Sequence, residues 1–133
     1  MLKAGCVVKV FAAHITPPHN KYYVIVSLEP LVLGFFINSE INAYIKRRPA
    51  LLSAQVKVLQ IEHGFLTYDS WLDCSDVHTF TRQYLDREVR TNPSALLGVL
   101  SAPAQTEMLR VVNASYTLAQ DHVTWISAAF SAK

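Results

Sequence analysis

Two apolar segments in the first third of the chain decide the fold: Lys21–Leu28 (KYYVIVSL) and Leu31–Asn38 (LVLGFFIN). Each is rich in β-branched and aromatic residues and has no helical period, which predicts a β-strand. Pro30 interrupts the pattern between them, so the two segments are expected to form an antiparallel hairpin. Because both strands are apolar on both faces, they are predicted to lie in the centre of a sheet.

Shorter strands are predicted before and after this hairpin. They are bounded by turn-forming residues and have the alternation or the composition of strands. They are residues 5–13 (GCVVKVFAA), residues 55–61 (QVKVLQI), a short strand around Leu72–Cys74, and residues 95–100 (ALLGVL). His14–Asn20 contains two consecutive prolines and is predicted as a loop, because proline cannot donate to a strand ladder. Ser39–Pro49 is predicted as a polar loop, and residues 81–89 as one or two helical turns.

A helix is predicted near the end of the chain, over about residues 103–116. Ser101 stands two residues before Pro103, as expected for an N-cap followed by a first-turn proline. Apolar residues then recur at spacings of three and four, the pattern of a one-sided helix. They are Met108, Val111, Val112, Tyr116 and, at the end, Leu118. The apolar tail from 121 to 133 is expected either to dock on the body or to fray.

The order of about six short strands followed by one helix predicts a mainly β protein of the α+β class. We expect a small antiparallel barrel with the helix packed at its end or over one face. A length of 133 residues matches the usual size of one domain, so residues 1–133 are expected to share a single core.

The composition is 51% hydrophobic and 17% charged, which is more apolar than an average domain. Strands buried on both faces and an apolar surface used for self-association both explain this excess, and we expect a homodimer.

The longest apolar run, Leu31–Ile37, is far shorter than the ~20 residues of a membrane-spanning helix, so a cytoplasmic protein without membrane contact is expected. Cys6 and Cys74 have no metal-binding or redox spacing and are predicted to be buried, reduced thiols.

The formal net charge of +2 is too small to indicate a nucleic-acid-binding protein by itself. The only compact basic cluster is Lys46-Arg47-Arg48, in the predicted loop after the hairpin. Such a cluster is either a solvated surface segment or a contact for phosphates.

Three segments, taken in order, resemble the PemK/MazF-like toxins of bacterial toxin–antitoxin systems. Lys21–Ser27, preceded by a proline-bearing loop, is similar to the family's strand "basic-x-Pro-ALVLS". Leu33–Ser39 is similar to its strand "V-x-V-x-P-I-T-S", and Leu97–Ser101 with the following helix is similar to its closing "G-x-L-S" strand and helix. The family usually has an arginine beside the proline of the second strand, whereas this chain has Pro17-Pro18-His19-Asn20-Lys21. Residues 68–93 have no counterpart in the family pattern.

The resemblance implies an SH3-like barrel and, in many members, a sequence-selective endoribonuclease that needs no metal or other cofactor. Its partners would be RNA and an antitoxin protein. Such cleavage uses the RNA 2′-hydroxyl as nucleophile, so the protein supplies a base, an acid and positive charge. The candidates are His19 as base or acid, Lys21 and Arg47 or Arg48 as the charge, and Ser39 as hydroxyl donor. Lys46, Arg47 and Arg48 are the expected RNA-binding residues.

The sequence leaves two other kinds of site and two other functions open. The segment 68–78 contains Asp69, Asp73 and Asp76, which either converge on a divalent cation or hold turns and helix caps. Cys74 and His78 are a candidate nucleophilic pair. At the level of function, the alternatives to a ribonuclease are a non-catalytic protein of the same fold that binds an antitoxin or a topoisomerase-like target, and an accessory phage or plasmid protein.

Overall fold

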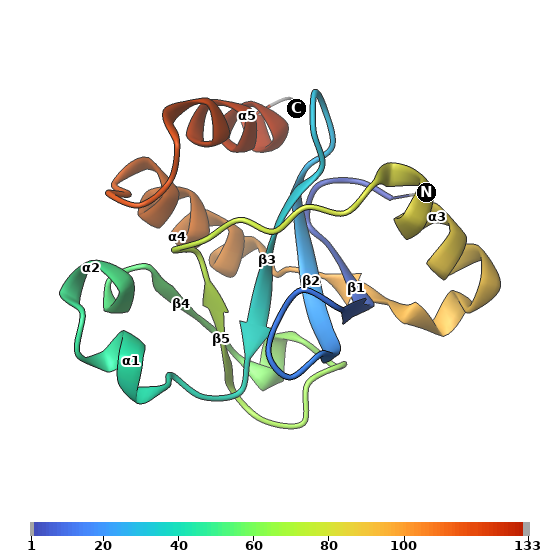
Figure 1. The fold of residues 1–133 in the computed structure, drawn as a ribbon, viewed down its shortest axis with the longest axis horizontal. Coiled ribbons are helices and arrows are strands. Elements are labelled where there is room, and N and C mark those ends of the chain that lie inside the picture. Colours follow the sequence, from blue (N-terminus) through green and yellow to red (C-terminus); the bar gives the residue numbers. More distant parts are fainter. Residues whose placement is uncertain (1, 132–133) are drawn as a thin grey trace.

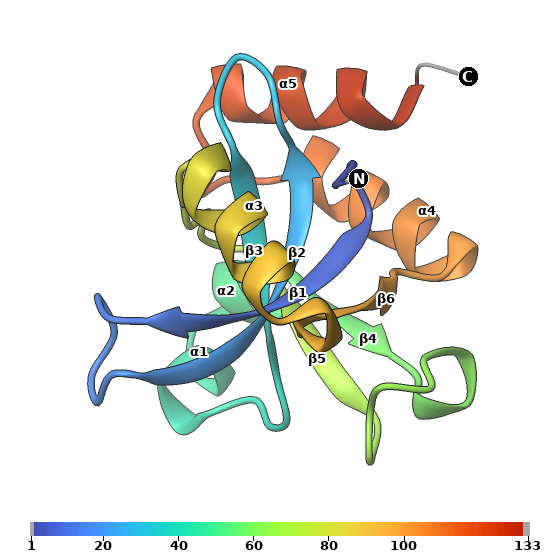
Figure 2. The ribbon, with the colours of Figure 1, turned by 90° about the vertical axis from the view of Figure 1, so that its right-hand side faces the viewer.

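The computed structural model describes residues 2–131 as a curled antiparallel sheet with helices on both sides (Figures 1 and 2). The six strands lie in the order β4-β5-β3-β2-β1-β6. Their bounds are β1 Cys6–Ala12, β2 His19–Ser27, β3 Leu33–Asn38, β4 Gln55–Val58, β5 Ser70–Asp73 and β6 Leu96–Val99. The end strands β4 and β6 are not hydrogen-bonded to each other, so the sheet forms a half-barrel.

Five α-helices and two short 3-10 helices join and cover the strands of the described part of the chain. The α-helices are α1 Ala43–Lys46, α2 Pro49–Leu52, α3 Arg82–Thr91, α4 Ala102–Asn113 and α5 Gln120–Ser131. The 3-10 helices are η1 Gln60–Glu62 and η2 Pro93–Ala95. In Figure 1, α4 and α5 lie on one side of the central strands and α3 on the other.

The hairpin of β2 and β3 is the centre of the sheet, as the sequence predicts. Its register pairs Tyr23 with Phe36 and Val24 with Phe35. Successive residues of a strand point to opposite faces, and here each face meets its own apolar cluster. Val24 and Phe35 belong to one cluster, and Tyr23 and Phe36 to the other.

The two faces of the hairpin are covered by different helices. The cluster that contains Val24 and Phe35 includes Met108 and Val112 of α4 and Ile126 of α5. The cluster on the opposite face includes Leu85 of α3. The apolar excess of the composition is therefore used in two cores of one chain. The homodimer remains a prediction. The strands that are apolar on both faces do not support it, because both faces are covered within one chain.

The predicted strands are confirmed, with shifted bounds. The first loop is shorter than predicted, because His19 and Asn20 belong to β2, and the strand predicted over residues 55–61 already ends at Val58. The predicted loop Ser39–Pro49 contains α1, and its last residue, Pro49, begins α2. A proline is tolerated there because the first helical position needs no amide donor.

The C-terminal helix is confirmed, and a second helix follows it. Ser101 is the N-cap of α4, and its side chain accepts a hydrogen bond from the amide of Ala104. The helix ends at Asn113, so the predicted end at 116 is wrong; Tyr116 lies beyond it and is 92% exposed. The tail forms α5, which docks through Val123 and Ile126. Residues 132 and 133 of the predicted tail lie outside the described residues.

Two further expectations concern the whole chain. Cys6 and Cys74 are both buried free thiols, as predicted. Within residues 2–131, no helix is long and apolar enough to cross a membrane.

Gly34 is required by the close packing of β3 on β2. A Cβ atom built on Gly34 would lie against the ring of Tyr23 and 2.6 Å from the carbonyl oxygen of Val24. The Gly34 backbone is also bridged to His78, with N···O distances of 3.0 and 2.9 Å. These two hydrogen bonds hold β3 close to Tyr23.

We expect Gly34→Ala to lower the free energy of unfolding by about 2–3 kcal/mol, because the added methyl group overpacks a fully buried site. Denaturant unfolding checks this. Gly64→Ala is the matched control, since a Cβ there meets no atom within 4 Å, and its effect should stay within about 0.5 kcal/mol. Equal midpoints for the two variants would contradict this account.

Candidate functional site

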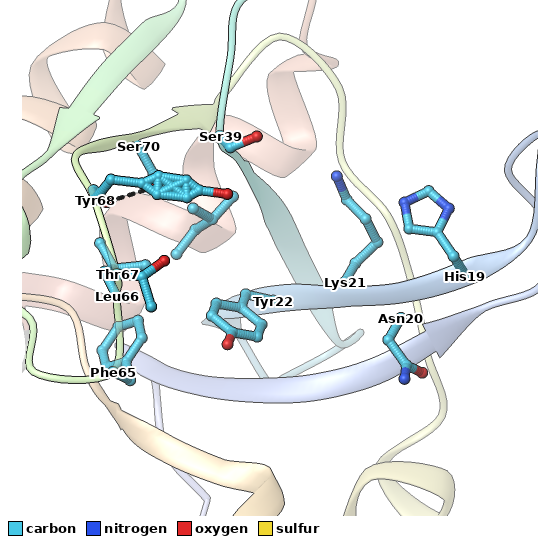
Figure 3. A pocket seen from close by; sticks show the side chains of 11 residues that line it. His19, Asn20, Lys21, Tyr22, Ser39, Phe65, Leu66, Thr67, Tyr68 and Ser70 are labelled. Carbon is cyan, nitrogen blue, oxygen red and sulfur yellow. Dashed lines mark hydrogen bonds between the residues drawn. The ribbon is translucent and has the colours of Figure 1, made fainter.

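A pocket of about 240 Å³ opens at the polar end of the central hairpin (Figure 3). One wall is the start of β2, and the opposite wall is the segment that runs from η1 into β5. The pocket is lined by His19, Asn20, Lys21, Tyr22, Ile37, Ser39, Phe65, Leu66, Thr67, Tyr68 and Ser70. Three of the predicted catalytic residues, His19, Lys21 and Ser39, therefore lie on one concave surface. Their catalytic roles stay predictions.

The strand geometry explains how these side chains meet. His19 and Lys21 are two residues apart on β2 and so share a face. Figure 3 shows them rising from the same side of the strand, while Tyr68 points its hydroxyl end toward them from the opposite wall. Ser39 enters from the end of β3, the hairpin partner of β2.

The imidazole of His19 is held in one tautomer by its own loop. Its Nδ1 lies 2.7 Å from the carbonyl oxygen of Pro17. A carbonyl oxygen only accepts, so Nδ1 carries the hydrogen and donates it. The Nε2 atom of the neutral ring is then an unprotonated acceptor. This is the form that a general base requires.

The ammonium group of Lys21 is half-buried among polar and aromatic partners. It donates a hydrogen bond to Oδ1 of Asn38 and lies 5.6 Å from the centroid of the Phe36 ring. Burial lowers the pKa of Lys21 from its ordinary value, and the carboxylate of Asp73 opposes this shift. A lysine in such a place gives up its proton more easily than one in water.

The far wall of the pocket supplies aromatic and hydroxyl groups. Tyr68 is 54% exposed, and the hydroxyl of Ser70 donates to the Tyr68 carbonyl oxygen (3.1 Å). The rings of Tyr22 and Phe65 meet edge to face at 6.0 Å and join the two walls. Thr67 and Tyr68 were not predicted to lie beside His19, because no local pattern predicts which distant loop faces a strand.

A buried histidine, His63, connects this wall to the start of α4 through hydrogen bonds. His63 is 2% exposed; its Nδ1 donates to the Leu59 carbonyl oxygen (2.7 Å), and its Nε2 accepts from the amide of Ser101 (2.9 Å). The Ser101 hydroxyl also donates to Glu62 (2.9 Å). The N-cap of α4 and the turn before the pocket are therefore one hydrogen-bonded unit. His63 was not a predicted site residue, because its partner Ser101 is distant along the chain.

The basic cluster is only partly associated with the pocket. Lys46, in the last turn of α1, lines an adjoining cavity together with Ser39. Arg48 stacks on Tyr44, with 3.6 Å between the guanidinium carbon and the ring centroid. Arg47 and Arg48 are exposed, and neither is among the residues that line the pocket of His19. The structure does not bring their charge to the other predicted catalytic residues.

Two of the three aspartates of segment 68–78 hold local structure. Asp73 accepts hydrogen bonds from the Ser75 amide (3.0 Å), the Ser75 hydroxyl (2.6 Å) and the Gln55 side chain (2.9 Å). Asp69 accepts from the Gln60 amide (2.9 Å). These are turn-holding roles. Within residues 2–131 no three His, Cys, Asp or Glu side chains are placed to hold a metal ion together.

Cys74 and His78 do not form a nucleophilic pair. Cys74 is fully buried in the cluster that α4 covers, whereas the His78 ring stacks on Phe36, which belongs to the cluster on the other face. Burial, aided by Asp73, raises the pKa of the Cys74 thiol well above its ordinary value. The thiol is therefore kept protonated and inert.

His78 is instead part of a small cluster beside Lys21. Its Nδ1 lies 3.0 Å from Nε2 of His14, and its Nε2 lies 3.8 Å from a carboxylate oxygen of Asp76. Burial lowers the pKa of His78; Asp76 and Asp73 oppose the shift, whereas His14 and Lys21 add to it.

No model of a known protein family matches the sequence, and no curated protein matches it at a significant level. The functional argument therefore depends on the site itself.

The lowered pKa of His78 makes stability depend on pH. The unfolded chain, in which the pKa has its ordinary value of 6.5, binds a proton that the folded chain resists. The free energy of unfolding should therefore fall as the pH drops below this value, until the folded-state pKa is passed. The contribution of this one group is at most about 1.4 kcal/mol per pH unit.

Denaturant unfolding at several pH values between about 7 and 5 measures this effect. His78→Gln should flatten the profile, because it removes the titrating ring but keeps the backbone bridge to Gly34. Asp76→Asn should extend the loss to lower pH, because it removes the charge that favours the imidazolium. An unchanged profile in His78→Gln would exclude this histidine as the cause.

Proposed function

We propose that this protein is a metal-independent endoribonuclease with the SH3-like barrel of the PemK/MazF-like toxins. The observation that carries the proposal is the convergence of His19, Lys21 and Ser39 in one pocket. The resemblance of the strand segments to that family is the second support. The curled antiparallel sheet with a helix after its last strand is compatible with a barrel of this type.

In the proposed reaction, Nε2 of His19 takes the proton of the RNA 2′-hydroxyl. The 2′-oxygen then attacks the adjacent phosphorus, and the bond from phosphorus to the 5′-oxygen of the next nucleotide breaks. The products are a 2′,3′-cyclic phosphate and a free 5′-hydroxyl. The fixed tautomer of His19 favours this step, because the acceptor nitrogen faces away from Pro17.

Lys21 supplies the charge and the second proton. Its ammonium group stabilises the negative charge that develops on the phosphate oxygens. Because burial lowers its pKa, it also donates a proton to the leaving 5′-oxygen more readily than an exposed lysine. The hydroxyl of Ser39 donates a hydrogen bond to a non-bridging oxygen. Lys21 is the basic residue of the segment in which the family usually carries an arginine.

The pocket has features that suit a single-stranded substrate. Tyr68 is exposed on the wall opposite the catalytic residues, and an aromatic ring stacks on unpaired bases. Lys46 lines the adjoining cavity together with Ser39, and in this proposal it contacts a neighbouring phosphate. In the cell, a toxin of this kind would be held inactive by an antitoxin protein, and it would act in the cytoplasm as a homodimer.

The test is cleavage of a mixed-sequence RNA by the purified protein in excess EDTA. We expect cleavage to persist, because side chains supply the chemistry. His19→Ala and Lys21→Ala should each lower the rate by about a hundredfold or more, since each removes a proton-transfer or charge-stabilising group. His122→Ala is the matched control, because His122 lies on α5 outside the pocket, and it should keep the full rate.

Full activity in both pocket variants would refute the assignment of these residues. Activity that vanishes in EDTA and returns with Mn²⁺ would refute the metal-independent mechanism. Absence of cleavage by the intact protein would favour the non-catalytic binding protein of the same fold.

A further inference from the structure

We infer that Trp71 and Lys57 form a second nucleotide subsite, on which the RNA strand continues beyond the pocket. This inference rests on the proposed function, and it adds how the substrate is held. Neither residue was a predicted site residue. The observations that carry it are the register of three strands, a cation–π contact and a cavity that shares Ser39 with the catalytic pocket.

The side chains form a row across the sheet. Trp71 of β5 is the direct partner of Lys57 on β4 and of Asn38 on β3. Asn38 in turn accepts the hydrogen bond of Lys21 on β2. Partners directly opposite each other point to the same face of a sheet, so the row Lys57–Trp71–Asn38–Lys21 lies on one face. Figure 1 shows these strands side by side.

This row faces away from the core that α4 covers. The neighbours of Trp71 and Lys57 along their strands, Leu72, Val56 and Val58, are buried in that core. Trp71 itself is half-buried and Lys57 is exposed. A large aromatic ring is therefore held on the outer side of the sheet, with one of the protein's cations beside it.

The row is continuous with the catalytic pocket. A cavity lined by Ser39, Glu40, Ile41, Lys46 and Trp71 adjoins the pocket, and Ser39 belongs to both. From Lys21 to Lys57 the row crosses three inter-strand steps of about 4.8 Å, or about 14 Å in all. This length accommodates several nucleotides, which are about 3.4 Å apart along a stacked strand.

The charges suit an RNA strand. Lys21 and Lys57 are the two ends of the row, and Lys46 lines the adjoining cavity. The opposite sign comes from Glu40 in that cavity and from Asp73, two residues from Trp71 on β5. The Lys57 ammonium lies 5.5 Å from the centroid of the Trp71 ring. Since Lys57 is exposed and flexible, its ammonium is able to move to a phosphate while the ring stacks on a base. An indole face beside lysines is a recurring way to hold single strands without reading their sequence.

The experiment uses a 2′-O-methylated 12-nucleotide RNA of mixed sequence, which binds but has no free 2′-hydroxyl to react. The chain has two tryptophans, so Trp125→Phe leaves Trp71 as the only indole. We expect the oligonucleotide to quench the fluorescence of this variant. Trp71→Leu should weaken binding by roughly tenfold or more, and Trp71→Phe should retain most of the affinity, because it keeps a stacking face.

Lys57→Gln tests the phosphate contact separately. It should reduce the slope of log affinity against log salt by about 0.7, the value expected for one phosphate contact to a single strand. Lys3→Gln is the control, because it removes the same charge from a groove beside α5; its slope should be unchanged. Circular dichroism of each variant establishes that the fold is retained.

The outcomes separate this inference from the proposed function. Binding through Trp71 without cleavage of unmodified RNA would overturn the ribonuclease and leave the subsite standing. Cleavage by the intact protein together with unchanged binding in Trp71→Leu and Lys57→Gln would overturn the subsite alone. No binding of the oligonucleotide by the intact protein would overturn the subsite whatever the result of the cleavage assay.

Discussion

The structure depends on one constraint: the β2–β3 hairpin is apolar on both faces, so each face must be covered. Tyr23 and Phe36 need a cover on one side, and Val24 and Phe35 on the other. Helix α3 covers one face, and helices α4 and α5 cover the opposite face. The position of Gly34 shows how close the packing is, because even one added methyl group would meet the Tyr23 ring.

The same hairpin is polar at one end, and that end carries the candidate site. His19 and Lys21 precede the apolar part of β2, and Asn38 and Ser39 follow that of β3. Antiparallel pairing places the start of one strand beside the end of the other, so these polar residues come together. The core thus fixes the position of the catalytic candidates without contacting a substrate itself.

Much of this arrangement could be predicted from local patterns. The alternation and composition of the strands, the N-cap at Ser101 and the polar ends of the hairpin are all local signals. The catalytic candidates came from a resemblance to a known family. What could not be predicted depends on distant partners: Tyr68 opposite His19, His63 joined to Ser101, and Trp71 between Lys57 and Asn38.

Two errors have related physical causes. The stripe through Tyr116 continues the helical spacing, but α4 ends at Asn113 and the following turn is held by the Ser115 hydroxyl. The two prolines predict a loop that includes His19, although β1 pairs with β2 as far as His19. In both cases hydrogen bonds formed in the folded chain override a pattern read along the sequence.

The central claim is that the RNA's own 2′-hydroxyl, and not a water molecule, is the nucleophile. The most direct measurement is the chemistry of the ends of cleaved RNA, determined by mass spectrometry. Attack by the RNA's own 2′-hydroxyl predicts a 2′,3′-cyclic phosphate on the upstream fragment and a 5′-hydroxyl on the downstream one. A 3′-hydroxyl and a 5′-phosphate would contradict the account, because they require attack by water on the phosphorus with cleavage of its bond to the 3′-oxygen.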